Sequence, residues 1–122
     1  MAKEKLFENK IKTFLHSIGI YAAGTPKDKM IVEQKGWFFK HWAGPYSPSG
    51  IPDIICCING KFVGIEVKAD NGHPSALQLR NISLIEKANG IGLIIYPKDF
   101  EMLKTLLIAV IEGKETEFYK LD

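Results

Sequence analysis

Residues 51–68 read IPDIICCINGKFVGIEVK. Two apolar runs, Ile51 to Ile58 and Lys61 to Lys68, lie on either side of Asn59-Gly60. This dipeptide is typical of a two-residue hairpin turn, because both of its positions tolerate the positive φ that such a turn requires. The stretch therefore predicts an antiparallel hairpin in which Ile58 lies opposite Lys61.

The same register places Asp53 opposite Glu66, with Lys68 two residues further along the same face. Carboxylates opposite each other lie about 5 Å apart at their Cβ atoms and repel, so this pair needs an explanation. A solvent-facing salt bridge with Lys68 is one alternative, and a bound divalent cation is the other. The second face is apolar apart from Lys61 and is expected to pack on a helix as core; it carries Ile54, Cys56, Ile58, Val63, Ile65 and Val67.

A Mg²⁺ ion suits this pair of carboxylates, because it takes oxygen ligands at about 2.1 Å and retains several waters. Lys68 lies too far along the strand to be a ligand, and is predicted to orient or deprotonate the attacking water or to stabilise charge on the phosphate. Pro52 lies opposite Val67 in the same register and has no N–H to donate. Our hypothesis is that the Val67 backbone carbonyl is thereby left free beside Asp53 as a third metal ligand. A carbonyl bonded within the sheet would contradict it.

These residues form a recognisable series of motifs. Gly50-Ile51-Pro52-Asp53, followed by Gly64-Ile65-Glu66-Val67-Lys68 and then by Gln78 and Gly90, resembles the VRR-NUC branch of the PD-(D/E)xK nucleases. The resemblance extends from Lys3 to Tyr96. It implies an α/β restriction-endonuclease-like core, in which a mixed central sheet carries the active site on its hairpin and is flanked by helices.

The resemblance also implies roles for individual residues. Asp53, Glu66 and the Val67 carbonyl would bind the metal, Mg²⁺ with Mn²⁺ as a substitute, while Lys68 and Gln78 would take part in catalysis. An acidic residue on the first helix would lie near the metal. Glu8 is preferred narrowly for this role, and Glu4 is the alternative.

Small stand-alone members of this family, many of them from phages, act in DNA recombination and repair on branched DNA. The resemblance therefore implies a metal-dependent endonuclease similar to a Holliday-junction resolvase, acting as a homodimer and without a small-molecule cofactor. Two alternatives stay open. The domain could be a DNA-binding or assembly subunit without catalytic activity, or a nuclease that acts on flaps or linear DNA.

Candidate DNA contacts are more widely spread. Aromatic side chains near the middle of the chain could stack on unpaired bases, although core packing is expected for most of them; they are Trp37, Phe38, Phe39, Trp42 and Tyr46. The polar candidates for phosphate contacts are Lys27, Lys29, Lys35, Lys40, His73 and Ser75.

Periodicity predicts the remaining elements of a single domain spanning residues 1–122. Helices are expected from Lys3 to Ser17, from Ala76 to Ala88 and from Phe100, capped by Asp99, to Gly113. Strands are expected at Trp37 to Ala43 and Ile91 to Tyr96, with an incipient strand at Met30 to Glu33 and an edge strand at Glu117 to Leu121.

Composition sets further limits. The 122 residues carry 16 Lys and Arg against 14 Asp and Glu, which excludes a protein that binds DNA through net charge alone. Residues 1–80 hold 11 basic and 7 acidic side chains, so the motif carboxylates lie in the more basic part. Adjacent Cys56 and Cys57 should point to opposite faces, and three scattered histidines make structural zinc unlikely. No membrane span or signal peptide is evident, so a cytoplasmic location is expected, in the host if the protein is phage-encoded.

Overall fold

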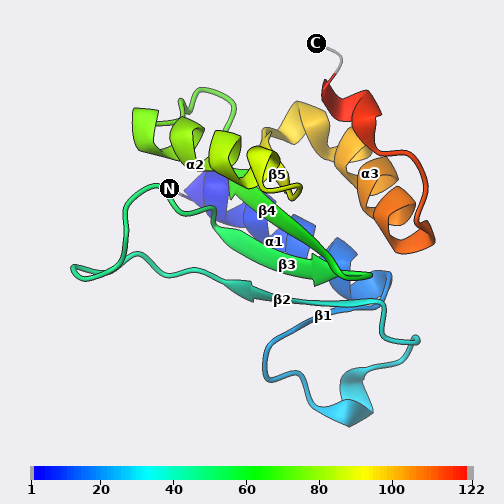
Figure 1. Cartoon of the computed structure of the whole chain (residues 1–122). Coiled ribbons are helices and arrows are strands. Elements are labelled where there is room, and N and C mark those ends of the chain that lie inside the picture. Colours follow the sequence, from blue (N-terminus) through cyan, green and yellow to red (C-terminus); the bar gives the residue numbers. More distant parts are fainter. Residues whose placement is uncertain (1, 121–122) are drawn as a thin grey trace.

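The computed structural model describes residues 2–120, which form an α/β domain around one mixed sheet (Figure 1). The helices are α1 (Ala2–Ser17), α2 (Ala76–Lys87) and α3 (Phe100–Glu112), with short 3₁₀ helices at Lys27–Lys29, Pro97–Asp99 and Glu117–Lys120. The strands are β1 (Ile20–Ala22), β2 (Gly36–Lys40), β3 (Ile54–Ile58), β4 (Lys61–Val67) and β5 (Ile91–Ile95).

The five strands lie in the order β1-β2-β3-β4-β5. The outer pairs β1/β2 and β4/β5 are parallel, whereas the inner pairs β2/β3 and β3/β4 are antiparallel. The hairpin of β3 and β4 is therefore central, flanked by β2 and β5. This mixed, helix-flanked sheet confirms the predicted α/β class.

The predicted hairpin register is confirmed. Ile58 pairs with Lys61 and Ile54 with Ile65, and the turn residues Asn59 and Gly60 have φ of 51° and 76°. Two positive φ values in succession define the turn type that matches the twist of the flanking strands. Strand β3 begins at Ile54, so residues 51–53 precede the ladder.

Helices α1 and α3 cover one face of the sheet and α2 covers part of the other (Figure 1). The apolar face of the hairpin, from Ile54 to Val67, packs with α1 and α3 in a single core, as expected. Helix α2 lies over β5 and the adjoining part of β4. A Cβ on Gly92 would lie 3.0 Å from the Ile82 carbonyl oxygen, so glycine allows α2 to approach the sheet closely. The outer faces of β2 and β3 are left without a helix.

The prediction of a strand near Met30 to Glu33 is wrong, since that segment is a loop and the first strand is β1. The Tyr21 hydroxyl donates to the Val32 carbonyl and accepts from the Val32 N–H, at 2.8 and 3.0 Å. A side chain thus satisfies the polar groups that a strand would have paired. Gly19, with φ of 88°, turns the chain from α1 directly into β1.

The predicted edge strand at Glu117 to Leu121 is also wrong over the described residues, which form a 3₁₀ helix at Glu117–Lys120; Leu121 lies outside them. Tyr119 and Lys120 both bind Glu86 of α2, which draws this segment toward α2 through side chains. Strand β2 ends at Lys40, three residues earlier than predicted.

Asp99 occupies the expected position before α3, but its side chain does not cap that helix. Its Oδ2 instead accepts the Tyr96 N–H at 3.0 Å. Over residues 2–120, no helix is long and apolar enough to span a membrane. Cys56 is buried and Cys57 exposed, which confirms that they face opposite sides of the sheet.

Candidate active site

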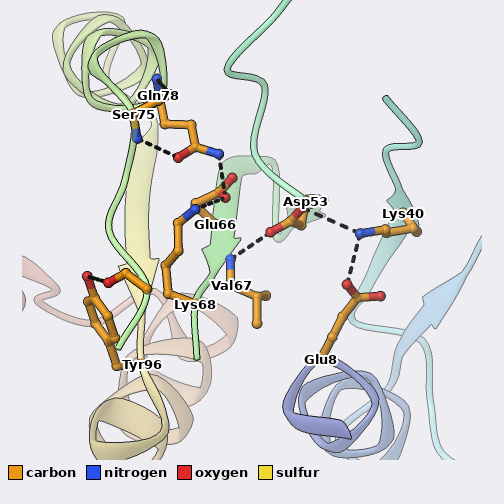
Figure 2. Close-up of polar contacts among 10 residues, drawn as sticks. Glu8, Lys40, Asp53, Glu66, Val67, Lys68, Ser75, Gln78 and Tyr96 are labelled. Atoms are coloured by element: carbon orange, nitrogen blue, oxygen red, sulfur yellow. Dashed lines mark hydrogen bonds and ion pairs between the residues drawn. The ribbon is translucent and has the colours of Figure 1, made fainter. Parts of the chain in front are cut away.

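Asp53 lies immediately before β3, at the end of the sheet where β4 ends (Figure 2). Its backbone carbonyl accepts the His41 N–H at 2.8 Å, which continues the pairing with β2. Its carboxylate Oδ2 accepts the Val67 N–H at 2.8 Å. Pro52 has no N–H to donate to β4 at this point of the hairpin. The Asp53 side chain instead connects the segment before β3 to β4.

The Val67 carbonyl faces the Asp53 side of β4. The Lys68 N–H donates to the Ile95 carbonyl at 2.9 Å, toward β5. Successive residues of a strand direct their backbone groups to opposite edges, so the backbone groups of Val67 point toward β3. The Val67 N–H, which bonds to Asp53, agrees with this direction. Pro52, opposite Val67, is buried and has no N–H. This is the orientation that the metal-ligand hypothesis requires, and the Val67 carbonyl stays a predicted ligand.

Glu66 is the most buried carboxylate of the site, with 3% of its surface exposed. Its Oε2 accepts the Gln78 side-chain amide at 2.8 Å and lies 3.3 Å from Lys68 Nζ. Its Oε1 is buried without a hydrogen-bond partner. Burial, together with the charge of Asp53, raises the pKa of Glu66 to about 7, although Lys68 opposes the shift. A buried carboxylate oxygen without a partner is costly unless a cation or donor reaches it.

Lys68 follows β4 directly, and its ammonium group is held near Glu66 (Figure 2). A Cβ on Gly72 would lie 3.4 Å from Lys68 Cδ, so the loop after β4 packs on the lysine stem. The Tyr96 hydroxyl donates to the Gly72 carbonyl at 3.0 Å and fixes this loop. The surrounding chain thus restricts the position of the ammonium group.

Gln78 connects Glu66 to the beginning of α2. Its side-chain oxygen accepts the Ser75 N–H at 2.8 Å, while its backbone N–H donates to Ser75 Oγ at 3.1 Å. This reciprocal capping box leaves the Gln78 amide nitrogen free to donate to Glu66. The Ser-x-x-Gln spacing is visible in the sequence and would have identified both the helix start and the role of Ser75.

We expect Ser75→Ala to lower the free energy of unfolding by about 1 kcal/mol, because it removes the N-cap acceptor of α2. Chemical denaturation measures the loss. Ser83→Ala, on an exposed part of the same helix, is the matched control and should change stability by less than half as much. Equal stability of the two variants would contradict the capping role.

Glu8, the preferred acidic residue of α1, is buried and reaches the site through Lys40. Lys40 Nζ lies 2.8 Å from Glu8 Oε1 and 3.4 Å from Asp53 Oδ1. Lys40 was predicted as a DNA contact, but its ammonium group lies between two carboxylates (Figure 2). Glu4, the alternative, is half-buried one turn earlier, and its charge contributes to the raised pKa of Glu66. Both residues of α1 therefore lie near the site.

The other predicted phosphate contacts are not brought to the carboxylates. Lys27 and Lys29 are exposed on a 3₁₀ helix, and Lys35 and His73 are exposed on loops. None of these three lysines forms an ion pair with Asp53 or Glu66. They stay predicted contacts.

Core packing was predicted for most of the five aromatic residues, and this is wrong. Phe38 alone is buried, whereas Trp37, Phe39, Trp42 and Tyr46 are exposed. Helix α2 covers only the β4 and β5 side of that sheet face, so the outward residues of β2 have no helix over them.

A cleft of about 320 Å³ adjoins the site. The loop from His41 to Ile51 lines it together with Asp53 and Gln78. Asn81 donates to the Ser49 carbonyl at 3.2 Å, so this loop is tied to α2. A larger hollow of about 670 Å³, beside β5, includes none of the motif residues. The cleft therefore adjoins two of the motif residues, Asp53 and Gln78.

The residues present fit a Mg²⁺ ion. Among residues 2–120 no three His, Cys, Asp or Glu side chains gather closely enough to hold a metal by themselves. Two carboxylates and a backbone carbonyl, completed by water, are nevertheless a usual set for Mg²⁺, and Glu66 Oε1 lacks any other partner.

No protein-family model, curated protein or solved structure matches the chain significantly. The fold and site define an α/β protein with two carboxylates and a lysine at one end of its sheet. Its relationship to the VRR-NUC nucleases is a prediction from the motifs.

Proposed function

We propose that this protein is a Mg²⁺-dependent endonuclease of the restriction-endonuclease-like type. The observation that carries the proposal is Glu66 Oε1, a buried carboxylate oxygen without a hydrogen-bond partner, on a residue close enough to Asp53 for that charge to raise its pKa. Lys68 and Gln78 both engage Oε2, so Oε1 is left for a cation or another donor. The arrangement suits a cation better than an ion pair.

In the proposed reaction, bound Mg²⁺ would supply Lewis-acid stabilisation of the phosphate. Asp53, Glu66 and the Val67 carbonyl would hold it. Gln78 fixes the orientation of Glu66 through a 2.8 Å hydrogen bond. The Lys68 ammonium group, held at 3.3 Å from Glu66, would orient the attacking water and stabilise charge that develops on the phosphate.

Branched DNA is the proposed substrate, cut by a homodimer similar to a Holliday-junction resolvase. The described residues form one small α/β domain, and we propose that it recognises the shape of branched DNA rather than its base sequence. A two-fold dimer would place two sites symmetrically on a four-way junction. The exposed Trp37 and Phe39 on the uncovered sheet face offer surface either for unpaired bases or for a second subunit.

We expect the protein to cleave a labelled four-way junction in Mg²⁺ faster than a flap or linear duplex, and Asp53→Asn to lower the rate by about 10³-fold or more. Asparagine keeps an oxygen for the Val67 N–H, so folding should persist. Binding without cleavage in Mg²⁺ and Mn²⁺ would refute the enzyme proposal and favour the assembly subunit. Equal cleavage of linear duplex would refute the resolvase proposal.

A further inference from the structure

We infer that Lys40 competes with the divalent cation for Asp53, and that Glu8 serves the site by holding Lys40 rather than by binding the metal. This inference rests on the proposed metal site. It assigns Lys40 a role as a positioning residue that the motifs do not include.

The contacts of Lys40 place its charge between two carboxylates. Its ammonium group lies 2.8 Å from Glu8 Oε1 and 3.4 Å from Asp53 Oδ1, and only 17% of its side chain is exposed. The Trp42 ring centroid lies 5.3 Å from the same nitrogen. The ammonium group therefore has a defined position, with contacts from α1, the segment before β3 and the Trp42 ring.

Each carboxylate oxygen of Asp53 already has a protein partner, so a cation bound there would share an oxygen with one of them. Oδ2 accepts the Val67 N–H, and Oδ1 pairs with Lys40. A cation bound at Asp53 would lie within a few ångströms of the ammonium charge. Like charges at that separation repel strongly in a partly buried site, so Lys40 should weaken metal binding.

Glu8 lies within 4 Å of three lysine ammonium groups, whereas Glu66, among the described residues, forms an ion pair with Lys68 alone. Lys12 Nζ lies 2.9 Å and Lys5 Nζ 3.6 Å from Glu8 Oε2, and Lys40 engages Oε1. Burial by itself would raise the pKa of Glu8, but the contacts and charges of Lys40 and Lys12 together outweigh it and lower the pKa. A carboxylate already matched by three lysines has little to gain from a metal. Its buried position instead anchors Lys40 next to Asp53.

The test is the affinity for metal in the absence of DNA, which does not depend on catalysis. Mn²⁺ titration followed by electron paramagnetic resonance, and the thermal shift caused by Mg²⁺, should both show about fivefold or greater tightening in Lys40→Met. Lys40→Arg keeps the charge and should bind metal as the wild type does. The matched control is Lys12→Met, which removes a lysine from Glu8 but leaves the Lys40 contact with Asp53, and should change the affinity less than twofold.

Unchanged or weaker metal binding by Lys40→Met would overturn the inference. Tightening of the same size in Lys12→Met would also overturn it, since the effect would then come from Glu8. Should Lys40→Met fail to fold, Lys40→Gln tests the same expectation. Failure of the proposed metal site is a distinct result, in which wild type and Asp53→Asn bind Mn²⁺ equally weakly.

Discussion

Lys68→Ala is expected to lower the cleavage rate by about 10²- to 10⁴-fold while leaving metal binding intact. The ammonium group lies 3.3 Å from Glu66 Oε2, next to the proposed metal, and it follows the strand that supplies two of the ligands. The substitution removes the positive charge of Lys68 and leaves the proposed oxygen ligands of the metal unchanged. Binding of Mn²⁺ should therefore be equal to, or tighter than, that of the wild type.

Single-turnover cleavage of the preferred DNA and Mn²⁺ titration together check this result. Lys61→Ala is the control, since Lys61 is half-exposed at the far end of the same strand, and its rate should stay within about twofold of the wild type. Loss of metal binding in Lys68→Ala would show that the lysine positions Glu66. Full activity would exclude Lys68 from catalysis.

The hairpin and its carboxylates could be predicted because their determinants are local. Asn59-Gly60 specifies the turn, and strict alternation then assigns every side chain to a face. The orientation of the Val67 carbonyl followed from the same register and from the missing N–H of Pro52. No tertiary contact had to be known for any of these steps.

The position of Lys40 beside Asp53 could not be predicted from local sequence patterns. Its position beside Asp53 depends on the antiparallel pairing of β2 with β3, which joins Lys40 to Ile54 across a loop, and on α1 crossing below that end of the sheet. Neither is encoded in a local pattern. The exposed aromatics of β2 were mispredicted for the same reason, because burial there depends on how far α2 extends over the sheet.

The loop at Met30 to Glu33 illustrates a different limit. Apolar Met30, Ile31 and Val32 favour a strand by propensity, but the Tyr21 hydroxyl takes both polar groups of Val32. A single long-range hydrogen-bonding side chain thus overrides a weak local preference. The sequence offers no sign of which tyrosine would do this.

Glu66→Gln should abolish cleavage and at the same time stabilise the protein when no divalent metal is present. The substitution keeps the shape of the side chain and an oxygen for Gln78, but removes a buried charge whose Oε1 has no partner. Burial and the charge of Asp53 outweigh the ion pair with Lys68 at Glu66, so removing this charge is expected to raise the free energy of unfolding by about 1–2 kcal/mol at pH 8. Loss of a metal ligand should reduce the cleavage rate by about 10³-fold or more.

The gain in stability should depend on pH in a defined direction. Burial raises the pKa of Glu66 from 4.5 to about 7, so the folded protein binds a proton that the unfolded chain has already lost between these values. The wild type therefore loses stability as the pH rises from about 4.5 to about 7, and Glu66→Gln lacks this loss. Denaturation in EDTA should show the two proteins close to equal in stability at pH 4.5 and most different at pH 8.

Saturating Mg²⁺ should reverse the order of stability at pH 8, because only the wild type can use the metal to offset its buried charge. A variant that is less stable than the wild type at pH 8 in EDTA would mean that Glu66 is a structural ion-pair partner of Lys68, and that the metal site is misplaced.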